Sequence, residues 1–245
     1  KPYTDSWPKS LMPIAGRPIL EHWLCILRRN CVTRVLVNVH HHHEAVEEFL
    51  RRSRFKRWVS VAYEENLLGT AGTLRINSNF FSDSNVLVIH DDNWCQCSFP
   101  DFLNYHKYQR PKHTVMTMMT FETKTPKTCG IVELDEEGVV QQLHEKVANP
   151  PGNLANGAVY AIGPEVLQWV NKNPGKTDFS TDVLPHFLGR ISTWHNSEIH
   201  RDIGTVPSLL AAQSDPPPLL CWPEVDDWQS KFKQNPIHRV LRSLA

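Results

Sequence analysis

The sequence is poor in glycine, with 11 glycines against 18 prolines in 245 residues. This ratio is the reverse of the usual one in globular proteins, and no glycine-rich phosphate-binding loop is found in the chain. An excess of one charge is also lacking, because 26 Lys and Arg balance 26 Asp and Glu. Without a broad basic field, the chain is not expected to bind nucleic acid, and any site for an anionic ligand must be local.

Long hydrophobic runs are missing as well. The longest uncharged apolar stretches, residues 86–90 and 114–121, are far shorter than the roughly 20 residues that span a bilayer. The first residues, KPYTDSWPK, lack the apolar segment of a secretory signal. The sequence therefore predicts a cytoplasmic protein that does not interact with membranes.

The spacing of the cysteines matches no known metal-binding or redox motif. Six cysteines are scattered along the chain, and Cys95 and Cys97 form a C-x-C pair without a matching second pair. That spacing fits neither a zinc ribbon nor a thioredoxin motif, so reduced thiols are expected. With 40% apolar residues, the chain is long enough for one large domain with a full core.

Helical and strand patterns alternate in the first half of the chain. Apolar residues recur on one helical face after Pro18, which suits a first helical position. Helices are expected over residues 19–27, 43–52 and 99–110, and strands over residues 34–39, 58–63 and 85–92. Continuous apolar strands between helices are typical of a parallel sheet that is covered on both faces.

The second half is richer in strands. Glu137 and Gly138 predict a hairpin turn within residues 129–146, and Pro164 opens a short helix after a strand at residues 156–162. Further elements are expected at residues 114–121, 177–188, 191–196, 198–203 and 206–213. The run DPPPLL then predicts a boundary, with one domain over residues 1–213 and a Pro-rich linker and C-terminal tail over residues 214–245. Two short helices are expected in the tail, at residues 226–233 and 237–244.

Two aspartates and a lysine are candidates for binding a metal ion and phosphate. Asp92 ends an apolar strand and Asp202 lies at a comparable strand end, where ligands bind in parallel sheets. Two converging carboxylates suit Mg²⁺, although each aspartate suits a helix cap or a turn equally well. Lys9 precedes the first helix, where it is either a solvated surface cation or a phosphate contact.

Two further patterns have a functional and a structural interpretation. In EENLLGTAG, Gly69 and Gly72 would let the backbone approach a flat ligand such as a nucleobase, but a tight turn with Thr70 as helix cap explains the pattern as well. Glu145 and Lys146 end another strand. They could bind a sugar hydroxyl and a phosphate, but an exposed ion pair is the commoner use of such residues.

Taken in order, eight segments resemble the sugar-1-phosphate nucleotidyltransferases, the family of glucose-1-phosphate thymidylyltransferase and mannose-1-phosphate guanylyltransferase. The segments are PKSLMPIAGRPILEHWL (8–24), LLGTAGTL (67–74), VLVIHDDN (86–93), CGIVELDEEG (129–138), EK (145–146), LANGAVY (154–160), DFSTDVLP (178–185) and RDIGT (201–205). The resemblance covers residues 1 to about 213 and excludes the tail. It departs from the family at Asp91, where the family has glycine before the metal-binding aspartate.

The resemblance implies an α/β fold. Such a fold has a Rossmann-like, mostly parallel central sheet with helices on both faces, and a smaller β-rich part that binds the sugar. The implied reaction joins an NTP and a sugar 1-phosphate into an NDP-sugar and pyrophosphate, with Mg²⁺. The sequences of LLGTAG and the other segments are most similar to those of guanylyltransferases. This similarity implies that the substrates are GTP and mannose 1-phosphate or a similar sugar 1-phosphate.

Roles follow from the resemblance by position. The phosphate contact would be Lys9, the metal ligands Asp92 and Asp202, and the base-binding residues Leu68, Gly69, Thr70 and Gly72. In the sugar-phosphate site, Gly130 would allow close approach, Glu145 would bind hydroxyls, Lys146 would bind the phosphate, and Asn156 would line the pocket. Catalysis is thus expected to depend on Lys9, Asp92, Lys146 and Asp202.

The family begins with a strand and a G-x-G-T-R loop ahead of the position of Lys1. We therefore expect the natural polypeptide to extend upstream by such a strand and loop. A rival hypothesis is a catalytically silent regulatory or scaffold subunit with the same fold, which the retained charged residues oppose. The expected partners are an NTP and a sugar 1-phosphate, and self-association into a homo-oligomer is left open.

Overall fold

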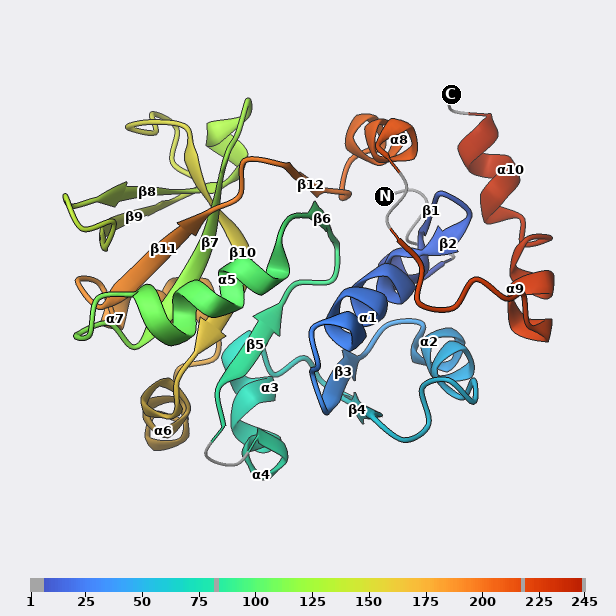
Figure 1. Ribbon diagram of the computed structural model, residues 1–245, viewed down its shortest axis with the longest axis horizontal. Helices are drawn as coiled ribbons and strands as arrows, with labels where there is room; N and C mark the ends of the chain where they lie inside the picture. The colour runs from blue at the N-terminus through green and yellow to red at the C-terminus, as the bar shows by residue number, and fades with distance from the viewer. Residues whose placement is uncertain (1–6, 82–83, 217–218, 244–245) are drawn as a thin grey trace. The chain divides into compact units, whose positions relative to one another are not determined.

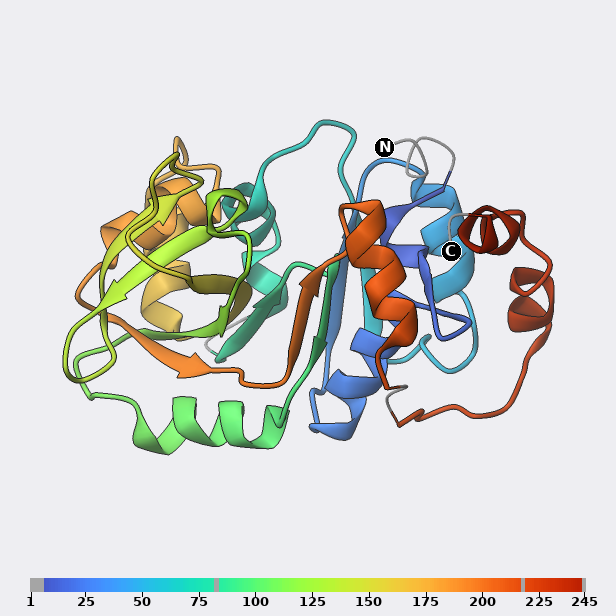
Figure 2. The same cartoon turned by 90° about the horizontal axis from the view of Figure 1, so that it is seen from above.

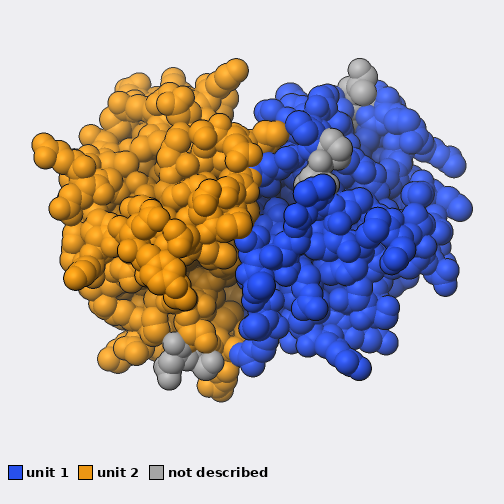
Figure 3. Space-filling model, viewed as in Figure 1, with its two compact units in different colours: residues 1–66, 91–96, 201–245 blue, residues 67–90, 97–200 orange. Residues whose placement is uncertain are grey.

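The computed structural model describes residues 7–81, 84–216 and 219–243. The chain divides into two compact units, coloured in Figure 3. Unit 1 comprises residues 1–66, 91–96 and 201–245, and unit 2 comprises residues 67–90 and 97–200. Each unit is therefore assembled from segments that are distant in sequence.

Unit 1 contains a parallel pair of strands flanked by helices (Figure 1). Its elements are β1 (Pro13–Ile14), β2 (Arg17–Pro18), α1 (Ile19–Arg29), β3 (Val35–Val39), α2 (His43–Leu50), β4 (Val59–Tyr63), β6 (Asn93–Gln96), α8 (Val206–Ser214), α9 (Asp227–Phe232) and α10 (Ile237–Arg242). The predicted apolar face of α1 is buried, with Trp23 and Leu24 almost inaccessible. Pro18 is the residue before the helix and not its first residue, which corrects the predicted start by one position.

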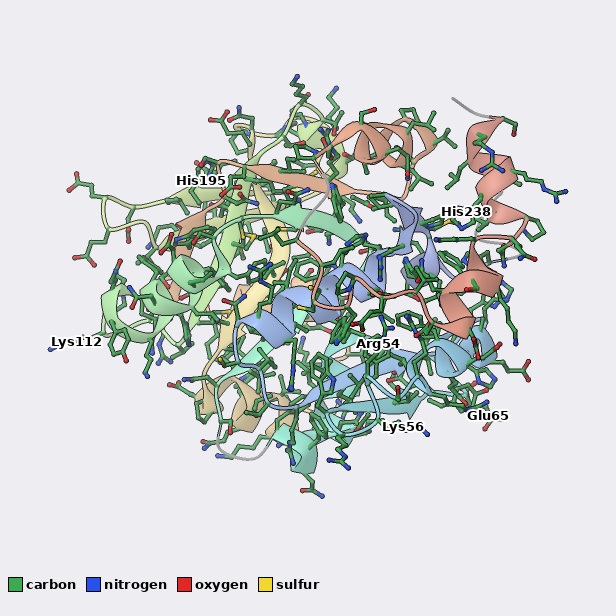
Figure 4. The ribbon with its side chains drawn as sticks, turned by 45° about the vertical axis from the view of Figure 1, so that its right-hand side comes forward. Arg54, Lys56, Glu65, Lys112, His195 and His238 are labelled. Atoms are coloured by element: carbon green, nitrogen blue, oxygen red, sulfur yellow. The ribbon has the colours of Figure 1, made fainter. Side chains whose placement is uncertain are left out.

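The C-terminal segment is an integral part of unit 1. The rings of Trp222 and Phe55 lie 5.3 Å apart, and those of Trp228 and Phe49 lie 4.9 Å apart. The buried Arg52 guanidinium donates to the Asp226 carboxylate at 2.8 Å. Helices α9 and α10 confirm the two helices predicted here, whereas the packing of Trp228 of α9 on Phe49 of α2 was not predicted. Figure 4 labels Arg54 and His238 in this part of unit 1.

Unit 2 is built on a six-stranded sheet. Its elements are α3 (Thr70–Ile76), α4 (Ser78–Phe81), β5 (Val86–Ile89), α5 (Phe99–Asn104), β7 (Met116–Glu122), β8 (Gly130–Leu134), β9 (Val140–Glu145), β10 (Leu154–Ile162), α6 (Pro164–Lys172), α7 (Leu184–His186) and β11 (Ile191–His195). Strand β12 (Ile199–Asp202) follows, and its last two residues belong to unit 1. The predicted hairpin at Glu137 and Gly138 joins β8 and β9.

The pairing pattern explains the direction of the strands. Strand β10 is antiparallel to both β5 and β7, so β5 and β7 run in the same direction, and β11 is parallel to β7. The reversed strand β10 therefore lies within a set of strands that share one direction. The β8–β9 hairpin, attached beside β10, is the smaller β-rich part. The predicted α/β class, with a mostly parallel set of strands, is confirmed.

Helices cover both faces of this sheet (Figure 2). Met116 and Met118 of β7 belong to the core cluster with Leu74 of α3 and Val166 of α6. Between them, Thr117 faces the opposite way, as alternation along a strand requires, and its hydroxyl contacts His106 beyond α5 at 2.9 Å. Among the described residues, no helix is long and apolar enough to cross a membrane.

Candidate functional site

Lys9 lies between two carboxylates in unit 1. Its ammonium donates to Asp92 Oδ2 at 2.5 Å and to Asp202 Oδ1 at 3.2 Å. The side chains of Lys9 and Asp92 are about one third exposed, at 31% and 33%, and that of Asp202 is 69% exposed. The structure therefore brings the three predicted phosphate-binding and metal-binding residues together at a surface that a ligand can reach.

The backbone explains why two aspartates so distant in sequence meet. Strand β6 directly follows Asp92 and pairs with β12, which ends at Asp202. The Ile203 N–H donates to the Asp92 carbonyl at 3.1 Å, and the Gly204 N–H donates to Asp202 Oδ1 at 2.7 Å. The Ser208 hydroxyl also donates to the Asp202 carbonyl, at 2.5 Å. The backbone is thus fixed at both aspartates, and the Asp202 carboxylate is also held by a main-chain N–H.

The charges in this cluster stabilise one another. Burial alone would lower the pKa of the Lys9 ammonium, but the charges and hydrogen bonds of Asp92 and Asp202 outweigh it and raise that pKa. Asp91 was predicted as an extra carboxylate next to the metal site. Burial, and then the charge of Asp92, raise the pKa of Asp91 to about 7. The Asp91 carboxyl therefore binds a proton more readily than an ordinary aspartate does.

Gly130, Glu145 and Lys146 lie together in unit 2. Gly130 and Glu145 are cross-strand partners in the β8–β9 pair, and a Cβ at Gly130 would lie 2.6 Å from Glu145 Oε2. The absence of a side chain at Gly130 therefore leaves room for the Glu145 carboxylate. The ammonium of the well-exposed Lys146 lies 3.6 Å from Glu145 Oε1. The two side chains thus form an ion pair, and the exposed ammonium can still contact a ligand.

Asn156 supports a bulge in β10. The strand pairing shifts register between Asn156 and Tyr160, and Ala158 has a positive φ of 52°. Asn156 Oδ1 accepts from the Ala158 N–H at 3.0 Å, and Asn156 Nδ2 donates to the Tyr160 hydroxyl at 2.7 Å. The pairing of Ala155 with Ile131 sets Asn156 near Gly130. The Asn156 side chain is thus oriented by its own strand.

Leu68, Gly69, Thr70 and Gly72 lie at the start of α3. Gly69 has a φ of 75° and precedes the helix without a side-chain cap. A Cβ at Gly69 would lie 2.4 Å from the Thr177 carbonyl oxygen. Glycine is therefore required here by a close approach of the backbone to Thr177. The alternative in which Thr70 caps this helix is wrong, because the Thr70 hydroxyl accepts from the Phe179 N–H at 2.7 Å.

The predicted residues thus form clusters inside each unit. Lys9, Asp92 and Asp202 belong to unit 1, and the base-loop and sugar-site candidates belong to unit 2. Gly204, Tyr160 and the segment 177–182 contact these candidates, although the sequence patterns did not predict them as site residues. The DFSTDVLP segment, with its paired aspartates, was the available signal for the last of these.

A sequence profile of the nucleotidyl transferases matches residues 1–216 of the chain. The chain belongs to the nucleotidyl transferase family. Its relatives include the mannose-1-phosphate guanylyltransferase catalytic subunit beta of Drosophila pseudoobscura pseudoobscura, which is 29% identical over 189 residues. That match covers 76% of this chain and 50% of the relative. The resemblance to sugar-1-phosphate nucleotidyltransferases is confirmed at the level of the family.

Other nucleotidyl transferase relatives give the same picture. Mannose-1-phosphate guanyltransferase 2 of Candida glabrata is 25% identical over 219 residues, which cover 86% of this chain and 59% of that protein. The chain thus spans only about half the length of such relatives. A structure of HddC from Yersinia pseudotuberculosis complexed with GMP-PN matches with a TM-score of 0.70 at 20% identity, over 84% of this chain and 88% of HddC. That likeness shows a shared fold.

Proposed function

We propose that this nucleotidyl transferase joins a sugar 1-phosphate to an NTP. A phosphate oxygen of the sugar 1-phosphate attacks the α-phosphorus, the bond from that phosphorus to the pyrophosphate breaks, and the products are an NDP-sugar and pyrophosphate. The observation that carries the proposal is the contact of Lys9 with both Asp92 and Asp202. A cation and two accessible carboxylates at strand ends suit a reaction between phosphates.

The reaction requires no nucleophile from the protein. The sugar phosphate is already an anion at neutral pH, so catalysis consists of positioning the two substrates and neutralising their charges. Lys9 and Lys146 would each supply positive charge to a phosphate for this purpose. Glu145 would accept hydrogen bonds from sugar hydroxyls, and Asn156, fixed by the β10 bulge, would line the sugar pocket.

Asp92 and Asp202 fit Mg²⁺ as ligands. Both carboxylates already contact one cation, the Lys9 ammonium, so the pair is arranged to share a positive charge. In the described part of the chain, no three His, Cys, Asp or Glu side chains are grouped as a metal site. The remaining ligands would therefore be water and phosphate oxygens, as Mg²⁺ commonly prefers. When bound, the ion would neutralise charge that develops on the phosphates, and Lys9 would donate to the phosphates.

We further propose GTP and mannose 1-phosphate, or a similar sugar 1-phosphate, as substrates. The support is that relatives at 25–29% identity are named mannose-1-phosphate guanylyltransferases or guanyltransferases. Leu68, Gly69, Thr70 and Gly72 would contact the base. The close approach of Gly69 to Thr177 fixes the path of the backbone in this loop.

A substrate panel tests the proposal. The full-length natural polypeptide is incubated with GTP, ATP, UTP, CTP or dTTP and with mannose, glucose or N-acetylglucosamine 1-phosphate, and pyrophosphate release is followed with and without Mg²⁺. We expect release only when both substrates and Mg²⁺ are present, fastest for GTP with mannose 1-phosphate. A protein that binds a nucleotide sugar but releases no pyrophosphate with any pair would contradict the proposal and favour a silent regulatory subunit.

Lys146→Ala should weaken binding of the sugar 1-phosphate more than binding of the NTP. The Lys146 side chain is well exposed, and its ammonium lies 3.6 Å from Glu145 Oε1. Loss of a charge-assisted contact costs roughly 1.5–3 kcal/mol, which corresponds to about a 10- to 150-fold higher Kd. Separate calorimetric titrations of the two substrates measure this. Lys112→Ala, in the same unit (Figure 4), is the control, and equal losses for both substrates would show that Lys146 is structural.

Gly204→Ala should lower turnover without unfolding the protein. A Cβ at Gly204 would lie 2.9 Å from Asp202 Oδ1 and 3.2 Å from Lys9 Nζ, so both groups must shift. Misplacement by about 1 Å can cost roughly 100-fold in rate, and we expect a loss of about 10- to 100-fold in kcat. Gly152→Ala is the matched control, because its Cβ would meet no atom within 4 Å. Unchanged kcat in the Gly204 variant would contradict the assigned role of this cluster.

A further inference from the structure

The start of α3 is held by a segment that lies more than 100 residues away in sequence. The Thr177 carbonyl accepts hydrogen bonds from the Ala71 N–H at 2.9 Å and from the Gly72 N–H at 3.3 Å. In return, the Phe179 N–H donates to the Thr70 hydroxyl at 2.7 Å. Main-chain groups in the first turn of a helix have no partner within the helix. Here the Thr177 carbonyl is the partner of two such groups, the N–H groups of Ala71 and Gly72.

Gly69 makes this contact close. Its positive φ of 75° and the 2.4 Å that would separate a Cβ from the Thr177 oxygen exclude other residues. The loop at residues 68–72 therefore depends on residues 177–179 for its conformation. Its own side chains provide no helix cap.

Asp182 in turn fixes residues 177 and 178. Its Oδ2 accepts from the Thr177 N–H at 2.9 Å and from the Asp178 N–H at 3.1 Å, and its Oδ1 accepts from Lys176 Nζ at 3.2 Å. Hydrogen bonds from the backbone N–H groups of Asp178 and Thr177 lower the pKa of the Asp182 carboxyl. The ionised carboxylate therefore holds the turn that presents the Thr177 carbonyl to α3.

We propose that Asp182 is a positioning residue for nucleotide binding. It touches no substrate. It acts by fixing Thr177, which fixes the 68–72 loop in the conformation that receives the base. The proposal rests on the proposed function of that loop. Because the loop is ordered before the nucleotide arrives, less conformational entropy is lost on binding.

The test compares Asp182→Ala and Asp182→Asn with a matched control. Asp135→Ala removes a carboxylate of the same unit that also accepts two backbone N–H groups, those of Glu137 and Val139, both at 2.9 Å, and one side-chain donor, Gln141. Amide hydrogen exchange of the 68–72 and 177–179 segments is measured first. GTP and mannose 1-phosphate are then titrated separately into the full-length protein.

In Asp182→Ala we expect faster exchange at Ala71 and Gly72. We also expect a roughly five- to tenfold higher Kd for GTP, the factor that corresponds to about one hydrogen bond, and a Kd for mannose 1-phosphate close to the parent value. Asp182→Asn keeps an acceptor and should give smaller changes. Asp135→Ala should leave both the exchange of Ala71 and Gly72 and the Kd for GTP unchanged.

Three results would overturn the proposal. They are unchanged exchange at Ala71 and Gly72 in Asp182→Ala, an unchanged Kd for GTP despite faster exchange, and the same effects in Asp135→Ala. If the parent protein binds no NTP, the proposed function of the loop fails, and with it the role of Asp182 in nucleotide binding. The exchange measurement then still decides whether Asp182 orders the loop, so the two failures are distinguishable.

Discussion

Asp92→Asn and Asp202→Asn should each nearly abolish nucleotide-sugar formation while leaving the fold intact. Each substitution removes one of the two charges that face the Lys9 ammonium and that we propose as Mg²⁺ ligands. Removing a group that stabilises transition-state charge costs about 10²- to 10³-fold in kcat, and we expect losses of at least that size. Because both proposed ligands serve one site, the double variant should lose little more than either single variant.

Measuring the stability of the two aspartate variants distinguishes a loss of catalysis from misfolding. Neither aspartate fills core volume, and substitutions at such accessible positions change stability by roughly 0.5 kcal/mol or less. The Tm should therefore shift by no more than about 2 °C. Asp227→Asn, an exposed aspartate of the same unit, serves as the control with normal kcat. Near-normal turnover in both Asp92→Asn and Asp202→Asn would remove the basis of the metal assignment.

Glu21→Gln should cause the largest loss of stability. The Glu21 side chain is 2% exposed and contacts Arg17 at 2.5 Å and Arg52 at 2.6 Å, with Arg54 3.6 Å away. Among the described residues, the only other carboxylate that forms an ion pair with these arginines is that of Asp226, which contacts Arg52 and Arg54. Neutralising Glu21 thus leaves three buried or half-buried guanidinium groups with one counter-charge.

Breaking a buried ion pair by removing one partner costs about 3–5 kcal/mol. At about 2–4 °C per kcal/mol for a protein of this size, the Tm should fall by roughly 6–20 °C, as measured by differential scanning calorimetry. Glu47→Gln is the matched control. Glu47 also contacts two cationic side chains, His43 and Arg51, but it is 29% exposed, and its loss should cost about 1 kcal/mol or less. Similar Tm changes in both variants would show that burial of the arginine cluster does not determine the effect.

Local patterns in the sequence predicted most of the helices and strands because those elements are stabilised by neighbours in the chain. Helix α1 follows its apolar periodicity, and the β8–β9 hairpin follows the turn at Gly138. The bulge in β10 had no such signal. Ala158 adopts a positive φ although it is not a glycine. The hydrogen bond from its N–H to Asn156 and the pairing of the neighbouring strands hold it in that conformation.

The candidate site depends on contacts between distant segments. Lys9 is separated from Asp92 by 83 residues and from Asp202 by 193 residues. Spacing alone therefore left open a solvated surface lysine and two aspartates in caps or turns, and the family resemblance was needed to group the three residues. The same limit applies to the base loop. A helix cap at Thr70 was one of two alternatives, but the partner of the Thr70 hydroxyl is Phe179, 109 residues away.

The proposed transfer of a nucleotidyl group to a sugar 1-phosphate is tested most directly with α-³²P-labelled GTP. The full-length polypeptide is incubated with the labelled GTP, mannose 1-phosphate and Mg²⁺, and the products are separated. The account predicts that the label appears in GDP-mannose, with one pyrophosphate released for each GDP-mannose formed, and that the Asp92→Asn variant yields neither product. Label that stays in GTP, or that appears in GDP or GMP without nucleotide sugar, would contradict it.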